Sequence, residues 1–384
     1  MRAETQVEII RTLLRHLADR RPVRADACAR VPAERYTSSE HLAREQATIL
    51  SRWPQLVALS GELPEPGSFL VRDLAAGSVV VTRDAEGTVH ALANVCRHRG
   101  ARVAEGEGSG RRLTCPYHAW SYHLDGTIAV VPDQESFPDA DLASCRLPRF
   151  PVLEWEGTIW VVPSTTAAPL EPAGLVADLG HIADDLVGYD IASHRHWRRH
   201  RFELAMNWKL VVDTFLEPYH FAALHRATVG PIFVSNLCTA ERSGLHVREV
   251  LPRKSIAELA EQPESTWDLV THSALVYVLF PSTVLVVQID HLELWRIQPV
   301  TGEPGRSIVE LDFFIPPGEL DESAERHWIR NWELTINTVL HEDFRAMTGV
   351  QANLASGHLD ALTFGRNEPA LALFHRALED AVAG

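Results

Sequence analysis

Two cysteines and two histidines lie at a spacing that could hold a metal cluster. His98 follows Cys96 by two positions, and His118 follows Cys115 by three. Each arm therefore offers one thiolate and one imidazole. A structural zinc site could use the same four side chains, although such sites usually keep like ligands together in each arm. The mixed arms fit better a 2Fe–2S cluster with two cysteines on one iron and two histidines on the other.

A second group of potential metal ligands lies in a stretch that we expect to be helical. Glu217, His220 and His225 fall within nine residues. Five positions along an ideal helix place two side chains roughly 140° apart. The two imidazoles could therefore share one metal if the helix widens locally, as it does in a π-bulge. Pro218 favours this widening because it has no N–H to give to the carbonyl of Thr214.

The periodicity of a long helix expected at 324–354 predicts a third ligand. Apolar residues such as Ile329 and Ile336 recur at sevens, and Asp343 falls in the same series. A buried carboxylate without a cation costs on the order of several kcal/mol. Asp343 should therefore have a cation, either an arginine or a metal, whereas neighbouring Glu342 lies on the flank and can face solvent. The preferred interpretation is a mononuclear Fe(II) site with two histidines and one carboxylate, His220, His225 and Asp343.

Short strands are the elements that must position the first group. Apolar runs typical of strands occur at 69–71, 78–82, 89–95 and 158–162. A looser segment begins near Pro163, where we place a domain boundary. We expect an N-terminal helical segment at 1–55, a cluster domain at 56–165 and a domain with the mononuclear metal at 166–384, which the N-terminal helices complete.

Beyond the boundary, strand patterns cover 275–289, 293–300 and 307–315, and helices are expected at 208–224 and 324–354. The fold class predicted is α+β, with a small antiparallel cluster domain and a second domain whose antiparallel sheet is packed by helices. The second domain should hold a largely apolar substrate pocket, and its candidate lining residues near the histidines are Thr214, Phe215 and Phe221.

Charge and hydropathy exclude several classes of partner. Lys and Arg total 36 and Asp and Glu total 51, so the net charge is −15. Nucleic acids and anionic membranes bind basic surfaces, so neither is expected as a partner. The most apolar stretch, 274–289, contains Pro281 and is shorter than the roughly 20 residues that a bilayer requires. Residues 1–21 have no apolar segment typical of a secretory signal, and a cytoplasmic protein is expected.

Two other features have a simpler interpretation. The basic run at 194–201 is expected to be a solvated strand, or else a docking patch for an acidic electron donor. Five cysteines without a secretory signal do not indicate a disulfide framework. The three that lack ligand spacing are expected to be small buried or surface thiols: Cys28, Cys145 and Cys238.

Together, the two metal-site groups resemble the catalytic alpha subunit of Rieske non-heme iron ring-hydroxylating oxygenases. The resemblance extends from about residue 37 to the C-terminus. The cluster loops lack the extra cysteines of electron-transport Rieske proteins, so they are similar to the oxygenase and ferredoxin type. The motifs that carry the resemblance are 94–100 (Asn-Val-Cys-Arg-His-Arg-Gly), Asn207-Trp208-Lys209, Tyr219-His220, and Glu342-Asp343 followed by Gln351.

The chain departs from this family's pattern at two places. It has Asp213-Thr214-Phe215 where the family commonly has Glu-Asn-Phe, so any role of that amide is in doubt. It also has Glu217 where the family commonly has aspartate. Glutamate occurs there in members that act on quaternary ammonium compounds, which is a weak indication of substrate.

The resemblance implies a terminal oxygenase with a 2Fe–2S cluster and a mononuclear Fe(II). Its electrons would come from NAD(P)H through a separate reductase, with or without a ferredoxin, and O₂ would hydroxylate or dihydroxylate a small hydrophobic, aromatic or alicyclic substrate. The alternatives are a monooxygenase or N-demethylase of a quaternary ammonium compound, a non-enzymatic Rieske electron carrier and a zinc-stabilised binding protein.

The resemblance also implies a role for Glu217. In the family, the acid at this position contacts both a histidine ligand of the mononuclear iron and a Rieske histidine of a neighbouring subunit, here His220 and His118. Electrons then cross between subunits arranged head to tail, and such a ring closes as a homotrimer. The alternative is an acid that only orients His220 within its own subunit.

Overall fold

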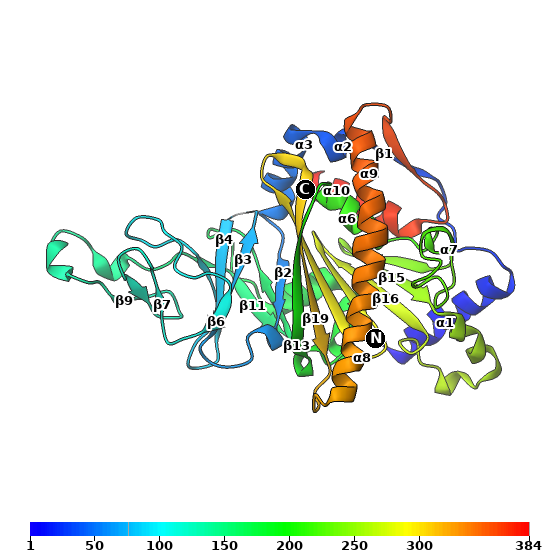
Figure 1. Cartoon of the computed structure of the whole chain (residues 1–384), viewed down its shortest axis with the longest axis horizontal. Helices are drawn as coiled ribbons and strands as arrows, with labels where there is room; N and C mark the ends of the chain where they lie inside the picture. Colours follow the sequence, from blue (N-terminus) through cyan, green and yellow to red (C-terminus); the bar gives the residue numbers. More distant parts are fainter. Residues whose placement is uncertain (76, 384) are drawn as a thin grey trace. The chain divides into compact units, whose positions relative to one another are not determined.

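Helices and antiparallel sheets make up the protein, and this arrangement confirms the predicted α+β class (Figure 1). The computed structural model describes residues 1–75 and 77–383. The chain folds as two units. The cluster unit comprises Leu50–Leu175 and Ile191–Arg195, and the pocket unit comprises Met1–Ile49, Val176–Asp190 and His196–Gly384.

Three antiparallel sheets form the cluster unit. The five-stranded sheet has the order β10 (Arg149–Phe150), β5 (Val89–Ala93), β4 (Gly77–Arg83), β3 (Ser68–Leu74), β6 (Glu107–Ser109). One three-stranded sheet has the order β11 (Val152–Trp155), β12 (Thr158–Val161), β2 (Gln55–Leu59), and the other has the order β7 (Leu113–Thr114), β8 (Ser121–Tyr122), β9 (Ile128–Val130). Four 3₁₀ turns connect these strands: η2 (Ser60–Glu62), η3 (Gln134–Ser136), η4 (Leu142–Ser144) and η5 (Ile191–Ser193).

The alternation of side chains along β4 links two cores of the cluster unit. Val79 and Val81 pack on one side with residues of β2 and β12. Val80 points to the other side and packs with Cys96 and Cys115. The strand predicted at 89–95 ends at Ala93, because the side chain of the next residue, Asn94, leaves the ladder and binds the loop that follows it.

A seven-stranded antiparallel sheet forms the centre of the pocket unit. The strand pattern at 275–289 forms two strands, because residues 280–282 make a turn between them. In sheet order the strands are β13 (Arg195–Leu204), β19 (Glu303–Ile315), β18 (Leu292–Val300), β17 (Thr283–Val287), β16 (Ser273–Leu279), β15 (His246–Pro252) and β14 (Thr239–Ser243). A separate pair joins β1 (Ala29–Pro32) to β20 (Ala361–Phe364).

The helices of the chain precede, interrupt and follow this sheet. In chain order they are α1 (Ala3–Ala18), α2 (Glu34–Thr37), α3 (Ser39–Glu45), η1 (Gln46–Leu50), α4 (Pro172–Leu179), α5 (His181–Gly188), α6 (Trp208–Asp213), α7 (Phe221–Leu224), η6 (Lys254–Glu261), η7 (Glu264–Thr266), α8 (Glu322–Ile336), η8 (Asn337–Asp343), α9 (Phe344–Ala355) and α10 (Pro369–Ala383). No helix among the described residues is long and apolar enough to cross a membrane.

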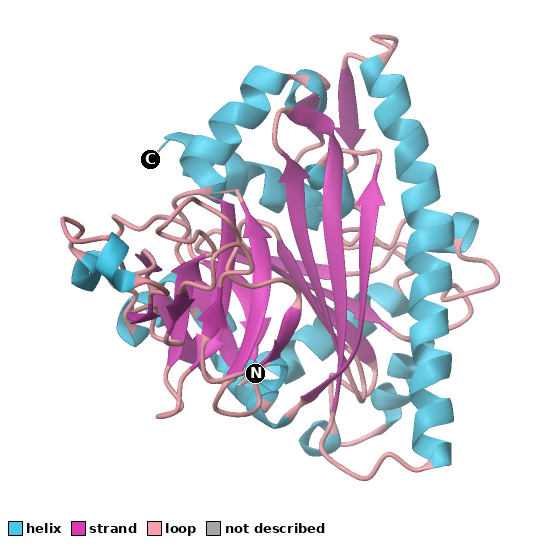
Figure 2. Cartoon of the chain, turned by 60° about the vertical axis from the view of Figure 1, so that its left-hand side comes forward, coloured by secondary structure: helices cyan, strands magenta, loops and turns pink. Residues whose placement is uncertain are grey.

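The long helix formed by α8, η8 and α9 lies beside the sheet in both views (Figures 1 and 2). Two tryptophans of α8 fix it there. The ring of Trp332 contacts that of Phe313 on β19 at a centroid distance of 5.9 Å, and Trp328 contacts His291 at 6.3 Å. This packing stabilises the helix and thereby sets the position of Asp343, which ends its central segment η8.

The basic run at 194–201 forms part of strand β13, as expected, but its charges are not simply solvated. His196 and Arg199 both bind the wholly buried carboxylate of Asp312, at 2.7 Å and 2.6 Å. These two side chains therefore hold the edge strand on the sheet through Asp312 on β19.

Candidate active site

The two histidines of the second group flank α7 rather than lying on one widened helix. Helix α6 starts at a side-chain cap, where Asn207 Oδ1 accepts from the N–H of Lys209, and it ends at Asp213. A new short helix begins after His220 and ends before His225. The predicted π-bulge at this place is wrong, because the chain leaves the helix before Pro218 and restarts after it.

The helical widening occurs instead on the opposite side of the site. Residues 337–343 form the π-helical segment η8, which ends at Asp343. Because the π-helix has a period of about five residues, Thr338 and Asp343 lie on the same side, and both are buried and line the same cavity. The apolar periodicity of the sequence did not indicate this widening, but it placed Asp343 correctly on the buried side of the helix.

Three ligand atoms converge at this point. The Nε2 atoms of His220 and His225 are 3.0 Å apart, and Asp343 Oδ1 lies 3.4 Å from the first and 3.1 Å from the second. Ligands about 2.1 Å from one ion and at right angles to each other are about 3.0 Å apart, so the spacing suits one face of an octahedral metal. Within the described part of the chain, no other group of three histidine, cysteine or acidic side chains is so close.

A carboxylate holds the second nitrogen of each ring. Glu217 Oε1 accepts from Nδ1 of His220, and Glu342 Oε2 accepts from Nδ1 of His225 at 2.6 Å. These contacts turn both Nε2 atoms toward the common point. The expectation that Glu342 faces solvent is wrong, because the ring of His225 holds its carboxylate at the site.

The electrostatics of the site also favour positive charge. Burial alone would lower the pKa of His220, but hydrogen bonds with Asp343 and Glu217 raise it to about 10. Surrounding carboxylates thus stabilise positive charge at this ring. A divalent metal bound between the three side chains would supply that charge in place of a proton.

The four residues of the first group lie on two similar loops of the cluster unit. Each loop turns back on its cysteine, because the N–H of Gly100 donates to the carbonyl of Cys96 at 2.9 Å and the N–H of Ala119 donates to that of Cys115 at 3.0 Å. Gly100 and Ala119 both have a positive φ, of +80° and +58°, which this turn requires. The rings of the two histidines, His98 and His118, meet at a centroid distance of 4.7 Å.

One unsatisfied nitrogen and one hydroxyl beside a sulfur show that this loop pair suits a cluster. Nδ1 of His98 is buried and has no hydrogen-bond partner, so a metal ligand bond would satisfy it. The hydroxyl of Tyr122 accepts from the N–H of Arg97 at 2.9 Å and lies 3.4 Å from Cys96 Sγ, so its proton can point to the sulfur. Burial and this sulfur raise the pKa of Tyr122. The phenol therefore remains a donor to a thiolate ligand, a contact that stabilises reduced clusters.

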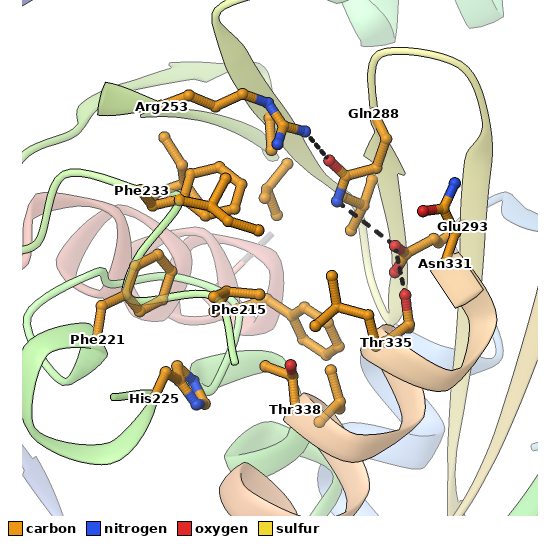
Figure 3. Close-up of a pocket in the computed structure, with 18 of the residues that line it drawn as sticks. Phe215, Phe221, His225, Phe233, Arg253, Gln288, Glu293, Asn331, Thr335 and Thr338 are labelled. Carbon is orange, nitrogen blue, oxygen red and sulfur yellow. Dashed lines mark hydrogen bonds between the residues drawn. The ribbon is translucent and has the colours of Figure 1, made fainter. Parts of the chain in front are cut away.

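A cavity of about 340 Å³ adjoins the three converging ligands. The structure places Thr214 in its lining, together with Phe215 and Phe221 (labelled in Figure 3). The hydroxyl of Thr214 donates to the carbonyl of Val211 at 2.6 Å, so this side chain has a partner on its own helix. The cavity is large enough for a small organic molecule beside the metal.

Sequence reasoning missed the polar part of the cavity wall. The walls were expected to be largely apolar, but several polar side chains from β18, from α8 and from residues that follow β15 and β17 also line the cavity (Figure 3). The sequence held only one sign of this polar wall, a charged residue inside an otherwise apolar strand pattern. Four of these polar side chains are Arg253, Gln288, Glu293 and Asn331.

The remaining cysteines take no part in either metal site. Cys28 is exposed, Cys145 is partly exposed and Cys238 is buried, and all three are free thiols. Burial and nearby Glu249 raise the pKa of Cys238, so this thiol stays protonated and behaves as a small core side chain.

Two family matches cover most of the chain. Residues 53–151 match the Rieske [2Fe-2S] domain. Residues 191–384 match the ring hydroxylating alpha subunit (catalytic domain). The first segment contains both cluster loops, and the second contains the three converging ligands.

Two curated proteins are similar to part of the chain. The carnitine monooxygenase oxygenase subunit of Escherichia coli (strain K12) is 29% identical over 198 residues, which are 51% of this chain and 52% of that protein. The glycine betaine monooxygenase oxygenase subunit of Pseudomonas aeruginosa (strain UCBPP-PA14) is 34% identical over 171 residues, which are 44% of this chain and 38% of that protein. The chain thus spans about half the length, or less, of these curated relatives.

A solved structure shares the fold over almost the whole chain. The crystal structure of the quaternary ammonium Rieske monooxygenase CntA with an inhibitor has a TM-score of 0.78 and 22% sequence identity. The similarity covers 92% of this chain and 95% of that one. Because the catalytic-domain match alone covers more than half of the residues, from 191 to 384, the chain belongs to the ring-hydroxylating alpha subunit family and carries a Rieske [2Fe–2S] domain ahead of its catalytic domain.

Proposed function

We propose that this chain is the terminal oxygenase component of a multi-protein system. It uses O₂ and electrons from a separate reductase to hydroxylate or dihydroxylate a small, mainly hydrophobic molecule. The observation that carries this proposal is the position of the three converging ligand atoms at the wall of a cavity of about 340 Å³. His220, His225 and Asp343 would hold a metal next to a molecule in the cavity.

Each residue group has a defined task in this proposal. When bound, the cluster supplies single electrons and the mononuclear iron supplies the chemistry of O₂. Glu217 and Glu342 keep the two imidazoles aimed at one point. Phe215 and Phe221 exclude water from the reacting end of the cavity. The cluster ligands are Cys96, His98, Cys115 and His118, and the iron ligands are His220, His225 and Asp343.

A partner protein must deliver the electrons, which we assign to an NAD(P)H-dependent reductase, with or without a ferredoxin. The cluster loops are accessible for such a partner. Tyr117, next to the ligand His118, is exposed, with 57% of its surface accessible. Arg99 lies over the Tyr117 ring at 5.3 Å and adds a positive charge to this surface. An acidic region of the partner would complement it.

We also propose a homotrimer in which Glu217 connects two metal centres. Its Oε1 contacts Nδ1 of His220, and its Oε2 accepts from the N–H groups of Tyr219 at 2.6 Å and His220 at 3.1 Å. A carboxylate offers about four acceptor directions, so Glu217 can take one more donor. With 11% of the side chain exposed, that donor can be His118 of the partner subunit.

A second candidate function is monooxygenation with N-demethylation of a quaternary ammonium compound. The aligned relatives from E. coli and P. aeruginosa are named for carnitine and glycine betaine. Three phenylalanines line the cavity, Phe215, Phe221 and Phe233. Aromatic faces attract quaternary ammonium groups, so the cavity has side chains suited to this substrate class as well.

Product analysis with labelled oxygen tests both candidates. The protein would be reduced with dithionite, freed of reductant and mixed with ¹⁸O₂ and a panel of aromatic, alicyclic and trimethylammonium compounds. The first candidate predicts an aromatic or alicyclic product that contains ¹⁸O, detected by mass spectrometry. The second predicts a demethylated amine and formaldehyde. Reoxidation of the cluster without any product across the panel would instead support an electron carrier.

The cluster assignment predicts the effect of replacing either cysteine. Cys96→Ser and Cys115→Ser should each lose the visible absorption of the cluster, because thiolate-to-iron charge transfer requires both sulfurs. Cys238→Ser is the matched control, since it also replaces a buried thiol but belongs to the pocket unit, outside the unit that carries the cluster loops. An unchanged visible spectrum in Cys96→Ser would exclude the assignment.

A further inference from the structure

The cavity contains a guanidinium that is not neutralised by any carboxylate. Arg253 directly follows β15, and its backbone N–H donates to the carbonyl of His272 at 2.8 Å. Its guanidinium lies over the ring of Phe233 at 4.8 Å and lines the cavity. Within the described part of the chain, Arg253 has no ion pair with an acidic side chain.

The polar contacts of Arg253 leave part of its hydrogen-bonding capacity unused. Nη2 donates to Oε1 of Gln288 at 2.6 Å, whereas Nε is buried and has no hydrogen-bond partner. Burial lowers the pKa of Arg253, and the charges of Asp290 and Glu293 offset this effect only in part. A neutral amide supplies no counter-charge, so the guanidinium can still form an ion pair with an anionic group in the cavity.

The nearby acids are already held by other partners. Glu293 accepts from the hydroxyl of Thr335 at 3.1 Å and the indole N–H of Trp295 at 3.1 Å. Gln288 donates to the same carboxylate at 3.5 Å, so it stands between Glu293 and Arg253 (Figure 3). These contacts keep Glu293 from moving onto the guanidinium.

Asp290, the other acid near Arg253, is held by two histidines. Its Oδ1 is 2.8 Å from Nδ1 of His291, and its Oδ2 is 2.6 Å from Nε2 of His327. Hydrogen bonds with Asp290 and Glu293 overcome the effect of burial and raise the pKa of His291. Both carboxylates near Arg253 are therefore engaged, and the guanidinium remains available to a ligand in the cavity.

We propose that Arg253 binds a carboxylate group of the substrate and thereby presents the other end of that molecule to His220, His225 and Asp343. This inference rests on the proposed oxygenase function and defines its substrate as a small monocarboxylate. Arg253 and His225 lie at opposite ends of the cavity (Figure 3). One guanidinium suits the single charge of a carboxylate, which it can contact through two parallel N–H groups.

The proposal assigns different parts of the substrate to different walls. The carboxylate lies against Arg253, near the amide of Gln288. The body of the molecule passes the rings of Phe233 and Phe215, and the carbon that is oxidised lies next to the iron ligands. Either an alicyclic or a trimethylammonium body fits these aromatic walls, so Arg253 selects for the acid group and not for the body.

Binding measurements without turnover test this role. Two carboxylates would be titrated by calorimetry against their carboxamides, namely cyclohexanecarboxylate and 4-trimethylammoniobutyrate. In the wild type, at least one carboxylate should bind about 10-fold more tightly than its amide, because only the carboxylate forms a charge-assisted pair with the guanidinium. Arg253→Gln should reduce this preference to less than about 2-fold, and Arg253→Lys should restore part of it.

A surface substitution supplies the matched control. Arg11→Gln also removes an arginine of the pocket unit, one that pairs with Glu264 on the exterior, and it should keep the wild-type preference. Absence of a carboxylate preference in the wild type, or its persistence in Arg253→Gln, would overturn the proposal. Oxygenation of neutral compounds would then still support the proposed function. A wild type that prefers carboxylates but oxygenates no compound would refute only the proposed oxygenase function.

Discussion

Asp343→Ala should abolish oxygenation while leaving the Rieske cluster intact. The substitution removes one of three ligand atoms that lie within 4.8 Å of each other, and two imidazoles alone hold iron weakly. Product formation should fall by more than about 100-fold, the upper end of what loss of a supporting residue costs a metal site. The measurement is single-turnover product yield, with iron content and the visible spectrum recorded on the same sample.

The neighbouring acid is the control for this experiment. Glu342→Ala removes a carboxylate from the same segment, but one that only orients His225. Its effect should therefore be smaller, within the roughly 10- to 100-fold range of a supporting residue. If Asp343→Ala keeps its activity and Glu342→Ala loses it, then Glu342 is the ligand and Asp343 has a structural role.

Glu217→Gln should separate electron transfer from metal binding. The amide has nearly the same size, so both metals and the substrate should remain bound. The amide lacks the negative charge of Glu217, which in the proposed trimer contacts both His220 and a cluster ligand of the partner subunit. The rate of cluster oxidation in a single turnover should therefore fall by about 100-fold.

Glu342→Gln is the matched variant for Glu217→Gln. Each of the two glutamates accepts a hydrogen bond from Nδ1 of one iron-ligand histidine, but only Glu217 is assigned to the bridge. A role limited to orienting a ring predicts equal effects for the two variants. The bridge predicts a much slower electron transfer in Glu217→Gln only. Full activity of a monomer, or wild-type single-turnover rates in Glu217→Gln, would rule the bridge out.

The sequence indicated the candidate ligands because their signals are local. Cys96 and His98 are two residues apart, and the turn that contains both closes at Gly100, so the loop can be inferred from a short stretch. Asp343 could be placed because the apolar side of a long helix repeats in the sequence. The structure then showed that this residue faces His220 and His225, which depends on the packing of α8 on the sheet.

Features that depend on distant contacts were missed. The interval from His220 to His225 suggested a widened helix. In the structure the helix is instead interrupted at Pro218, and the two histidines flank the short helix that follows. Glu342 was assigned to solvent because a helix period cannot show that His225 reaches it across the site. Arg253 had no signal either, since its significance comes from Gln288, 35 residues further along the chain.

The central claim is that one chain holds two different iron centres, and metal analysis with EPR tests it most directly. The account predicts about three iron atoms per chain, of which about two belong to the cluster. Dithionite reduction should give the EPR signal of a Rieske cluster, and Asp343→Ala should lose about one iron while keeping that signal. A wild-type protein with only the cluster irons would instead be an electron carrier, and a colourless protein with zinc would contradict both metal assignments.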